Sequence, residues 1–136
     1  MTESSHHDVI VIGGGPAGST VARYAAANGA DVLVIDGRDP IGTPLQCGEL
    51  VPSNEEMRRL CPNVPEMDDL FQTPEAAISR RSTKMHIVPP SGKAMKFGFE
   101  GLVLNRVAHD EALVDMAKEN GAEYLVDAHV TKVEGN

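Results

Sequence analysis

A glycine-rich turn near the N-terminus constrains the fold more than any other feature of this chain. The apolar, β-branched segment 8–12 predicts a buried strand, and the sequence Gly-Gly-Gly-Pro-Ala-Gly follows it at 13–18. The alanine-rich segment 19–28 predicts a helix that ends at Gly29, and 31–36 predicts a second buried strand. These segments predict a β-α-β unit with parallel strands, and therefore an α/β fold with a Rossmann-like core.

The turn matches the pattern Gly13-x-Gly15-x-x-Gly18 of dinucleotide-binding sites. Gly13 permits the tight turn, Gly15 lets the backbone approach a pyrophosphate, and Gly18 lets the helix pack closely on the strand. Free N–H groups and the helix dipole favour an anion at the first helical turn. The residues that we predict to bind the pyrophosphate are Gly13, Gly15, Pro16, Ala17 and Gly18.

The second predicted strand ends in an acid, Asp36, 23 residues after Gly13. An acid at this place accepts hydrogen bonds from ribose hydroxyls and disfavours a 2′-phosphate, which indicates FAD or NAD. Arg38 weakens that preference, because a nearby arginine can accommodate a 2′-phosphate. We assign Asp36, Gly37 and Arg38 to the adenosine end of the cofactor.

The remainder of the chain predicts a small antiparallel β excursion, that is, a β segment inserted into the Rossmann-like core, followed by further elements of that core. Segment 37–52 has many glycines and prolines and predicts a long loop, and Ser53 opens a capping box for a helix through Leu60. Further elements are predicted as a helical turn at 67–71, a hairpin of strands 84–88 and 93–99, a short strand at 102–104, a helix from the cap Asn105 to Asn120, and closing strands at 124–127 and 129–133.

Composition disfavours several classes of function. The chain has 20 Asp and Glu against 12 Lys and Arg, a net charge of −8, and no basic run. We therefore expect no nucleic-acid binding and no polybasic patch for anionic lipid. Cys47 and Cys61 form no CxxC pair, and no metal site is predicted. No apolar run is long enough to span a bilayer and no signal peptide is evident, so we expect a cytoplasmic protein.

Three stretches of the sequence resemble the geranylgeranyl reductase family, within the p-hydroxybenzoate-hydroxylase-like flavoproteins. The first is 8–19 with the alanines and arginine at 22–25, and the second is 41–49, which is similar to a G-x-P-x-x-C-G-E loop. The third is the turn at 90–93 with 103–106 and Asp110-x-x-Leu113, which is similar to an R-x-x-F-D-x-x-L helix start. The resemblance covers nearly the whole chain.

This resemblance implies FAD as the cofactor and a reaction in which reduced FAD gives a hydride to isoprenoid double bonds of geranylgeranyl lipids. It implies that Cys47 and Gly48 lie beside the isoalloxazine and that Arg106 approaches the cofactor. Cys47 and Glu49 are the candidates for catalysis, through proton delivery. The sequence departs from the family pattern at His109, where an aromatic residue is usual, and at 45–46, where a basic residue often precedes the cysteine.

The resemblance also implies an isoprenoid lipid substrate, NAD(P)H or a ferredoxin as electron donor, and room for peripheral contact with a membrane. Such flavoproteins have a later glycine-aspartate motif and a separate lipid domain, so we expect 1–136 to be the N-terminal FAD/NAD(P)-binding domain of a longer enzyme, inactive by itself. Three alternatives stay open: another FAD-dependent monooxygenase or electron-transfer dehydrogenase, a non-catalytic nucleotide-binding chain, and an NAD-binding domain. The long loop after Asp36 disfavours the last.

Overall fold

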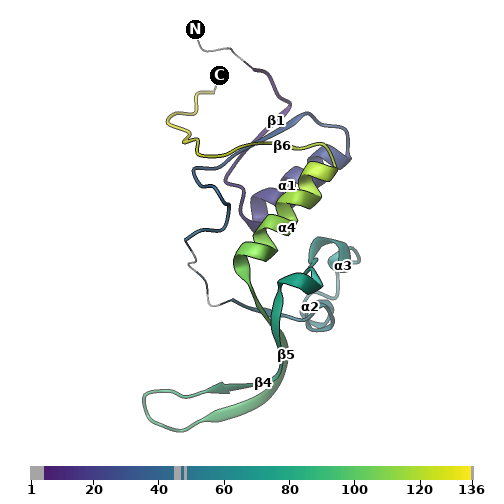
Figure 1. Ribbon diagram of the computed structural model, residues 1–136. Helices are drawn as coiled ribbons and strands as arrows, with labels where there is room; N and C mark the ends of the chain where they lie inside the picture. The colour runs from purple at the N-terminus through teal and green to yellow at the C-terminus, as the bar shows by residue number, and fades with distance from the viewer. Residues whose placement is uncertain (1–4, 45–46, 48, 136) are drawn as a thin grey trace. The chain divides into compact units, whose positions relative to one another are not determined.

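The computed structural model describes residues 5–44, 47 and 49–135 (Figure 1). The chain forms two compact units, one of Met1–Gln46 with Asp110–Asn136 and one of Cys47–His109. Helix α4 (Arg106–Glu119) begins in the second unit and ends in the first. No helix of the described residues is long and apolar enough to cross a membrane.

The first unit is a three-stranded parallel sheet with helices packed on it. Strand β1 (Val9–Ile12), helix α1 (Pro16–Ala27), strand β2 (Val32–Ile35) and strand β6 (Glu123–Leu125) follow one another along the chain, and the sheet order is β1-β2-β6. Val9 pairs with Val32 and Leu33 pairs with Glu123, both in parallel register. The predicted parallel Rossmann-like core is confirmed.

The core of this unit lies on one face of the sheet. Val32 and Val34 point to that face and are fully buried, together with Ala22 of α1 and Ala117 of α4. Small alanine side chains let both helices approach the β-branched strand residues closely. The first helix begins at Pro16, ahead of the alanine-rich segment, as expected from the fit of proline to the first helical turn.

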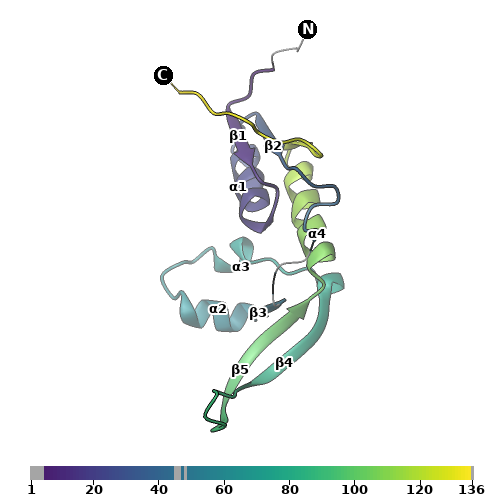
Figure 2. The ribbon, with the colours of Figure 1, turned by 90° about the vertical axis from the view of Figure 1, so that its left-hand side faces the viewer.

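The second unit is built around a long antiparallel hairpin (Figure 2). Strands β4 (Ile78–Ile87) and β5 (Met95–Leu104) pair along their length, and β3 (Leu50–Pro52) pairs with the end of β5, so that the order is β3-β5-β4. The unit also contains α2 (Asn54–Leu60), α3 (Met67–Leu70) and a 3-10 turn at Glu75–Ala77. Ser53 caps α2 by accepting a hydrogen bond from the Glu56 N–H, as predicted.

Three element predictions are wrong. Leu50–Pro52, predicted as loop, forms β3 because it finds a partner in Gly101–Val103, far along the chain. For the same reason 102–104 is the end of β5 and not a separate strand. Segment 129–133, predicted as a strand, forms none, because Asp127 takes a positive φ of 51° and turns the chain out of the sheet directly after β6.

Candidate dinucleotide-binding site

The glycines of the turn after β1 have different reasons to be glycine. Gly13 has a φ of +100°, a conformation that side chains oppose. A Cβ on Gly18 would lie 1.8 Å from the Gly13 carbonyl oxygen, so α1 can pack on the turn only with glycine there. A Cβ on Gly15 would meet nothing within 4 Å. The fold therefore requires Gly13 and Gly18, whereas Gly15 leaves open space in front of the helix.

The N-terminus of α1 has no side-chain cap and can therefore bind an anion. Gly15 is its N-cap and supplies no side-chain hydrogen bond, Pro16 occupies the first turn, and no acidic side chain lies in that turn. The N–H groups of a first helical turn carry a partial positive charge and need partners. Together with the open space at Gly15, this fits the pyrophosphate of a dinucleotide.

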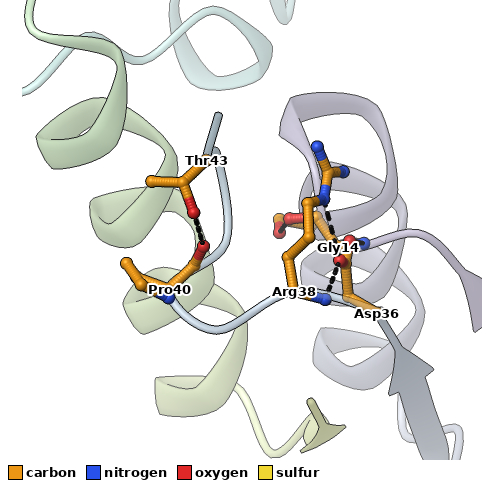
Figure 3. A network of polar contacts seen from close by, with 6 residues as sticks. Gly14, Asp36, Arg38, Pro40 and Thr43 are labelled. Atoms are coloured by element: carbon orange, nitrogen blue, oxygen red, sulfur yellow. Dashed lines mark hydrogen bonds and ion pairs between the residues drawn. The ribbon is translucent and has the colours of Figure 1, made fainter. Parts of the chain in front are cut away.

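Asp36 lies directly after β2 and is held rigidly beside the glycine turn (Figure 3). One carboxylate oxygen accepts a hydrogen bond from the Gly14 N–H at 2.8 Å. The other accepts from the Arg38 backbone N–H at 2.9 Å and from its Nε at 3.2 Å. The residue is only 4% exposed. A carboxylate has further lone pairs, so Asp36 keeps the capacity to accept hydrogen bonds from ribose hydroxyls.

The same contacts fix the charge of Asp36. Burial by itself raises the pKa of the carboxyl, but the hydrogen bonds from Gly14 and Arg38 and the nearby guanidinium outweigh it, so that the pKa lies below the ordinary value of 3.8. Asp36 is therefore ionised at neutral pH. Its charge and the Arg38 side chain lie together at the predicted adenosine end.

We expect Asp36 to stabilise the fold in a pH-dependent way. The pKa of Asp36 is lower in the folded chain than in the unfolded chain. Its contribution to the free energy of unfolding is therefore present above the unfolded value of about 4 and is lost as the pH falls through the folded pKa. Asp36→Asn should lower the free energy of unfolding by about 1–2 kcal/mol at pH 7. Urea unfolding of both proteins between neutral and acid pH checks this: the difference should shrink toward acid pH, and a constant difference would contradict the assignment.

A hollow of about 390 Å³ opens at the carboxyl end of β1 and β2. That volume lies within the usual range for small-molecule sites. Its lining brings together predicted and unexpected residues: Ile12, Gly13, Ile35, Asp36, Gly37, Arg38, Ala128, His129 and Val130. The hollow therefore brings Gly13 of the glycine turn together with the three residues predicted for the adenosine end, whereas Gly15, Pro16, Ala17 and Gly18 are not part of its lining.

Sequence reasoning missed the side of the hollow formed by 128–130. The Ala128 N–H donates a hydrogen bond to the Asp36 carbonyl, which brings this segment across the end of β2. His129 then lies so close to Gly37 that a Cβ there would be 2.2 Å from the imidazole Cε1. A side chain at position 37 would therefore have to displace the His129 imidazole. The signal was Asp127, since aspartate tolerates a positive φ and can end a strand.

Two further residues that sequence reasoning missed hold the glycine turn from inside. Ser19 is fully buried, and its Oγ donates a hydrogen bond to the Gly14 carbonyl at 2.7 Å. The Tyr124 hydroxyl of β6 donates to the Ser19 Oγ at 3.0 Å. Burial raises the pKa of Tyr124, so its hydroxyl stays protonated and able to donate. Ser19 and Tyr124 are therefore positioning residues for the turn.

The predicted flavin-side residues belong to the second unit. Cys47 is exposed, Arg106 is the first residue of α4, and Glu49 has a positive φ of 62°. The Glu49 carbonyl accepts a hydrogen bond from the Leu104 N–H at 2.8 Å, which ties the loop to β5. Gly48, Leu45 and Gln46 lie outside the described residues. The approach of Cys47, Gly48, Glu49 and Arg106 to a flavin stays a prediction.

Comparison with known proteins agrees with this geometry. The family model of pyridine nucleotide-disulphide oxidoreductases matches residues 7–134. An uncharacterized protein in the nifH2 5′ region of Methanosarcina barkeri is 38% identical over 135 residues, which is 99% of this chain and 73% of that protein. The digeranylgeranylglycerophospholipid reductase of Methanosarcina acetivorans is 36% identical over 131 residues, 92% of this chain and 30% of the enzyme.

Solved structures give the same picture. A geranylgeranyl bacteriochlorophyll reductase-like protein from Thermoplasma acidophilum matches with a TM-score of 0.72 and 33% identity, over 89% of this chain and 30% of that protein. The halogenase PltM matches with a TM-score of 0.67 at 20% identity, which shows a shared fold alone. The expected resemblance to geranylgeranyl reductases is confirmed, and the chain spans about 30% of the length of the reductases that it matches.

Proposed function

The chain belongs to the pyridine nucleotide-disulphide oxidoreductase family, and from this premise we propose that it is the FAD-binding part of a flavin-dependent reductase that saturates isoprenoid double bonds. The observation that carries the dinucleotide assignment is the open, uncapped N-terminus of α1 at Gly15 beside the carboxylate of Asp36. The likeness to geranylgeranyl reductases favours FAD over NAD at this site. FAD is the cofactor that this site binds, with its pyrophosphate at 13–18 and its adenosine ribose at Asp36.

Each part of the site has its own task in binding. The N–H groups of the first turn of α1 neutralise the pyrophosphate, and Ser19 keeps the turn in place through the Gly14 carbonyl. Asp36 orients the ribose, while His129 and Val130 form a wall of the hollow at the adenosine end. Arg38 holds the Asp36 carboxylate through two hydrogen bonds.

The substrate assignment is an isoprenoid lipid with geranylgeranyl chains. It is supported by the relatives, which are named digeranylgeranylglycerophospholipid reductases, and by the Cys-Gly-Glu sequence at 47–49. The chemistry supplied by a reduced flavin is hydride donation to a carbon–carbon double bond. Cys47 or Glu49 delivers the proton to the neighbouring carbon, and Arg106 contacts the cofactor. The electrons come from NAD(P)H or a ferredoxin.

A chimera tests the substrate assignment. We expect this chain, substituted for the matching part of the Methanosarcina acetivorans reductase, to give an enzyme that reduces a geranylgeranyl lipid, followed by mass spectrometry of the product. Cys47→Ala in the chimera should lower the rate by about 100-fold or more, the typical loss when a proton-transfer group is removed. Flavin absorbance of the purified chimera shows in parallel whether FAD is bound.

Cys61→Ala is the matched control, because Cys61 is the other cysteine of the second unit and ends the short helix α2. It should leave the rate unchanged within about twofold. A chimera that binds FAD and leaves the lipid double bonds intact would contradict the reductase assignment. A Cys47→Ala chimera with full activity would remove Cys47 from the mechanism and leave Glu49 as the proton donor to be tested.

A further inference from the structure

Two hydroxyl groups meet inside a core that is otherwise built from alanine and valine. Tyr124 of β6 pairs with Val34 of β2, so its side chain lies on the same face of the sheet as the buried Val34. Ser19 and Ala22 are the buried residues of α1, which packs on that face. The Tyr124 ring therefore reaches Ser19, and its hydroxyl donates to the Ser19 Oγ at 3.0 Å. All four residues belong to the first unit.

These two hydroxyls are not needed to fill the core. Burying a polar group costs free energy that its hydrogen bonds only partly return. Alanine in place of Ser19 and phenylalanine in place of Tyr124 would occupy nearly the same space without that cost. The hydroxyl pair therefore points to a task other than stability, and its third partner, the Gly14 carbonyl, places that task in the glycine turn.

The hydrogen bond from Ser19 departs from the usual pattern of a hydroxyl in a helix. Such a side chain commonly donates to the carbonyl four residues earlier, and Thr20 does so, with its Oγ1 2.7 Å from the Pro16 oxygen. Ser19 instead donates to the Gly14 carbonyl, five residues earlier and outside the helix. Because the Tyr124 hydroxyl donates to the Ser19 Oγ, it favours the orientation in which the Ser19 proton points to Gly14.

Gly14 is thereby held at both ends. Its N–H donates to Asp36 at 2.8 Å (Figure 3), and its carbonyl accepts from Ser19. In a trans peptide the C=O and the following N–H point in opposite directions. Fixing the Gly14 carbonyl toward the core therefore directs the Gly15 N–H to the open side of the turn. Among the described residues, that N–H has no hydrogen-bond partner, and a Cβ on Gly15 would meet nothing within 4 Å.

Without this anchor, the peptide plane between Gly14 and Gly15 is free to turn over. Glycine on both sides opposes such a rotation less than any other residue does. The rotated plane would present the Gly14 carbonyl oxygen, a partial negative charge, at the place where we propose that the pyrophosphate lies. An anion binds at this turn only when N–H groups face it.

We propose that Tyr124 is a positioning residue for the dinucleotide, acting through Ser19 to keep the Gly15 N–H directed at the pyrophosphate. The proposal rests on the proposed function and deepens it, because it adds a determinant of cofactor affinity that lies in the core behind the turn. The Tyr124 ring also supports the turn directly, since a Cβ on Gly14 would lie 3.4 Å from its Cε1. Phenylalanine at 124 keeps that ring and removes only the hydroxyl.

Calorimetric titration of the whole chain with FAD tests the proposal. We expect Tyr124→Phe to weaken FAD binding about three- to tenfold and Ser19→Ala at least about fivefold, as for the loss of one well-placed hydrogen bond. A tenfold loss corresponds to a Gly15 N–H that faces the site in about one molecule in ten. Because Tyr124 acts through Ser19, the double variant should bind FAD as Ser19→Ala does, within about twofold.

Two further measurements separate positioning from a purely structural role. The melting temperature of the double variant should fall by less than about 5 °C, because both hydroxyls leave the core together and the freed carbonyl turns to water. The ¹³C resonance of the Gly14 carbonyl, which responds to hydrogen bonding, should move in the same direction in Tyr124→Phe as in Ser19→Ala. Weakened FAD binding with an unmoved Gly14 resonance would overturn the proposal.

Tyr24→Phe is the matched control, because Tyr24 is the other tyrosine of the chain and lies on α1 of the same unit. It should change FAD affinity by less than about twofold and leave the Gly14 resonance in place. Wild-type affinity in Tyr124→Phe, or losses that add up in the double variant, would also overturn the proposal. A folded wild-type chain without FAD binding would instead refute the nucleotide site itself, so the wild-type titration alone distinguishes the two failures.

Discussion

Gly18→Ala is expected to destabilise the chain severely, although alanine normally stabilises a helix. In an exposed helix interior the change from glycine to alanine is favourable by about 1 kcal/mol. Here the new Cβ would lie 1.8 Å from the Gly13 carbonyl oxygen, and backbone atoms cannot yield as a flexible side chain can. We expect a loss of more than about 3 kcal/mol, seen as a fall in the melting temperature of about 10 °C or more.

The melting temperature is measured by circular dichroism, with Gly98→Ala as the control. A Cβ on Gly98 meets nothing within 4 Å and the residue has no positive φ, so the same chemical change should leave the melting temperature unchanged or slightly higher. If the Gly18→Ala protein has the same melting temperature as the wild type, α1 does not pack on the turn in the way described. The geometry from which the dinucleotide site is argued would then be wrong.

The second large effect is on binding and leaves the fold intact. Gly15 has extended backbone angles that alanine adopts freely, and its Cβ would enter open space. That space is where we propose that the pyrophosphate lies. Gly15→Ala should therefore cost less than about 1 kcal/mol of stability and weaken FAD binding at least about tenfold.

Fluorescence titration with FAD checks the Gly15 prediction, and Gly98→Ala again serves as the matched control that should bind like the wild type. The pair Gly15→Ala and Gly18→Ala separates the two reasons for glycine in one motif. Full FAD affinity in a folded Gly15→Ala protein would show that the pyrophosphate lies elsewhere.

The parts of this molecule that sequence predicts well are those fixed by local chemistry. The β-branched runs of β1 and β2, the glycine turn between them and the acid at Asp36 are adjacent in sequence and follow short-range rules, and the structure places them as expected. The capping of α2 by Ser53 is equally local.

The parts that sequence reasoning missed depend on distant partners. Leu50–Pro52 forms a strand only because it pairs with Gly101–Val103 of β5. The segment 128–130 reaches the site only because Asp127 turns the chain and the Asp36 carbonyl accepts the Ala128 N–H. Ser19 looks like an ordinary helix residue until Tyr124, 105 residues later, is seen to donate to it.

Binding of FAD by this chain is the central claim, and calorimetric titration with FAD, FMN and NAD⁺ tests it most directly. The proposed site predicts saturable FAD binding, and weaker binding of FMN because FMN lacks the adenosine that we assign to Asp36 and 128–130. The likeness to geranylgeranyl reductases predicts weaker binding of NAD⁺ than of FAD. Asp36→Ala should weaken FAD binding and leave FMN binding nearly unchanged. A folded chain that binds FMN as tightly as FAD, or NAD⁺ in preference to FAD, would contradict the account.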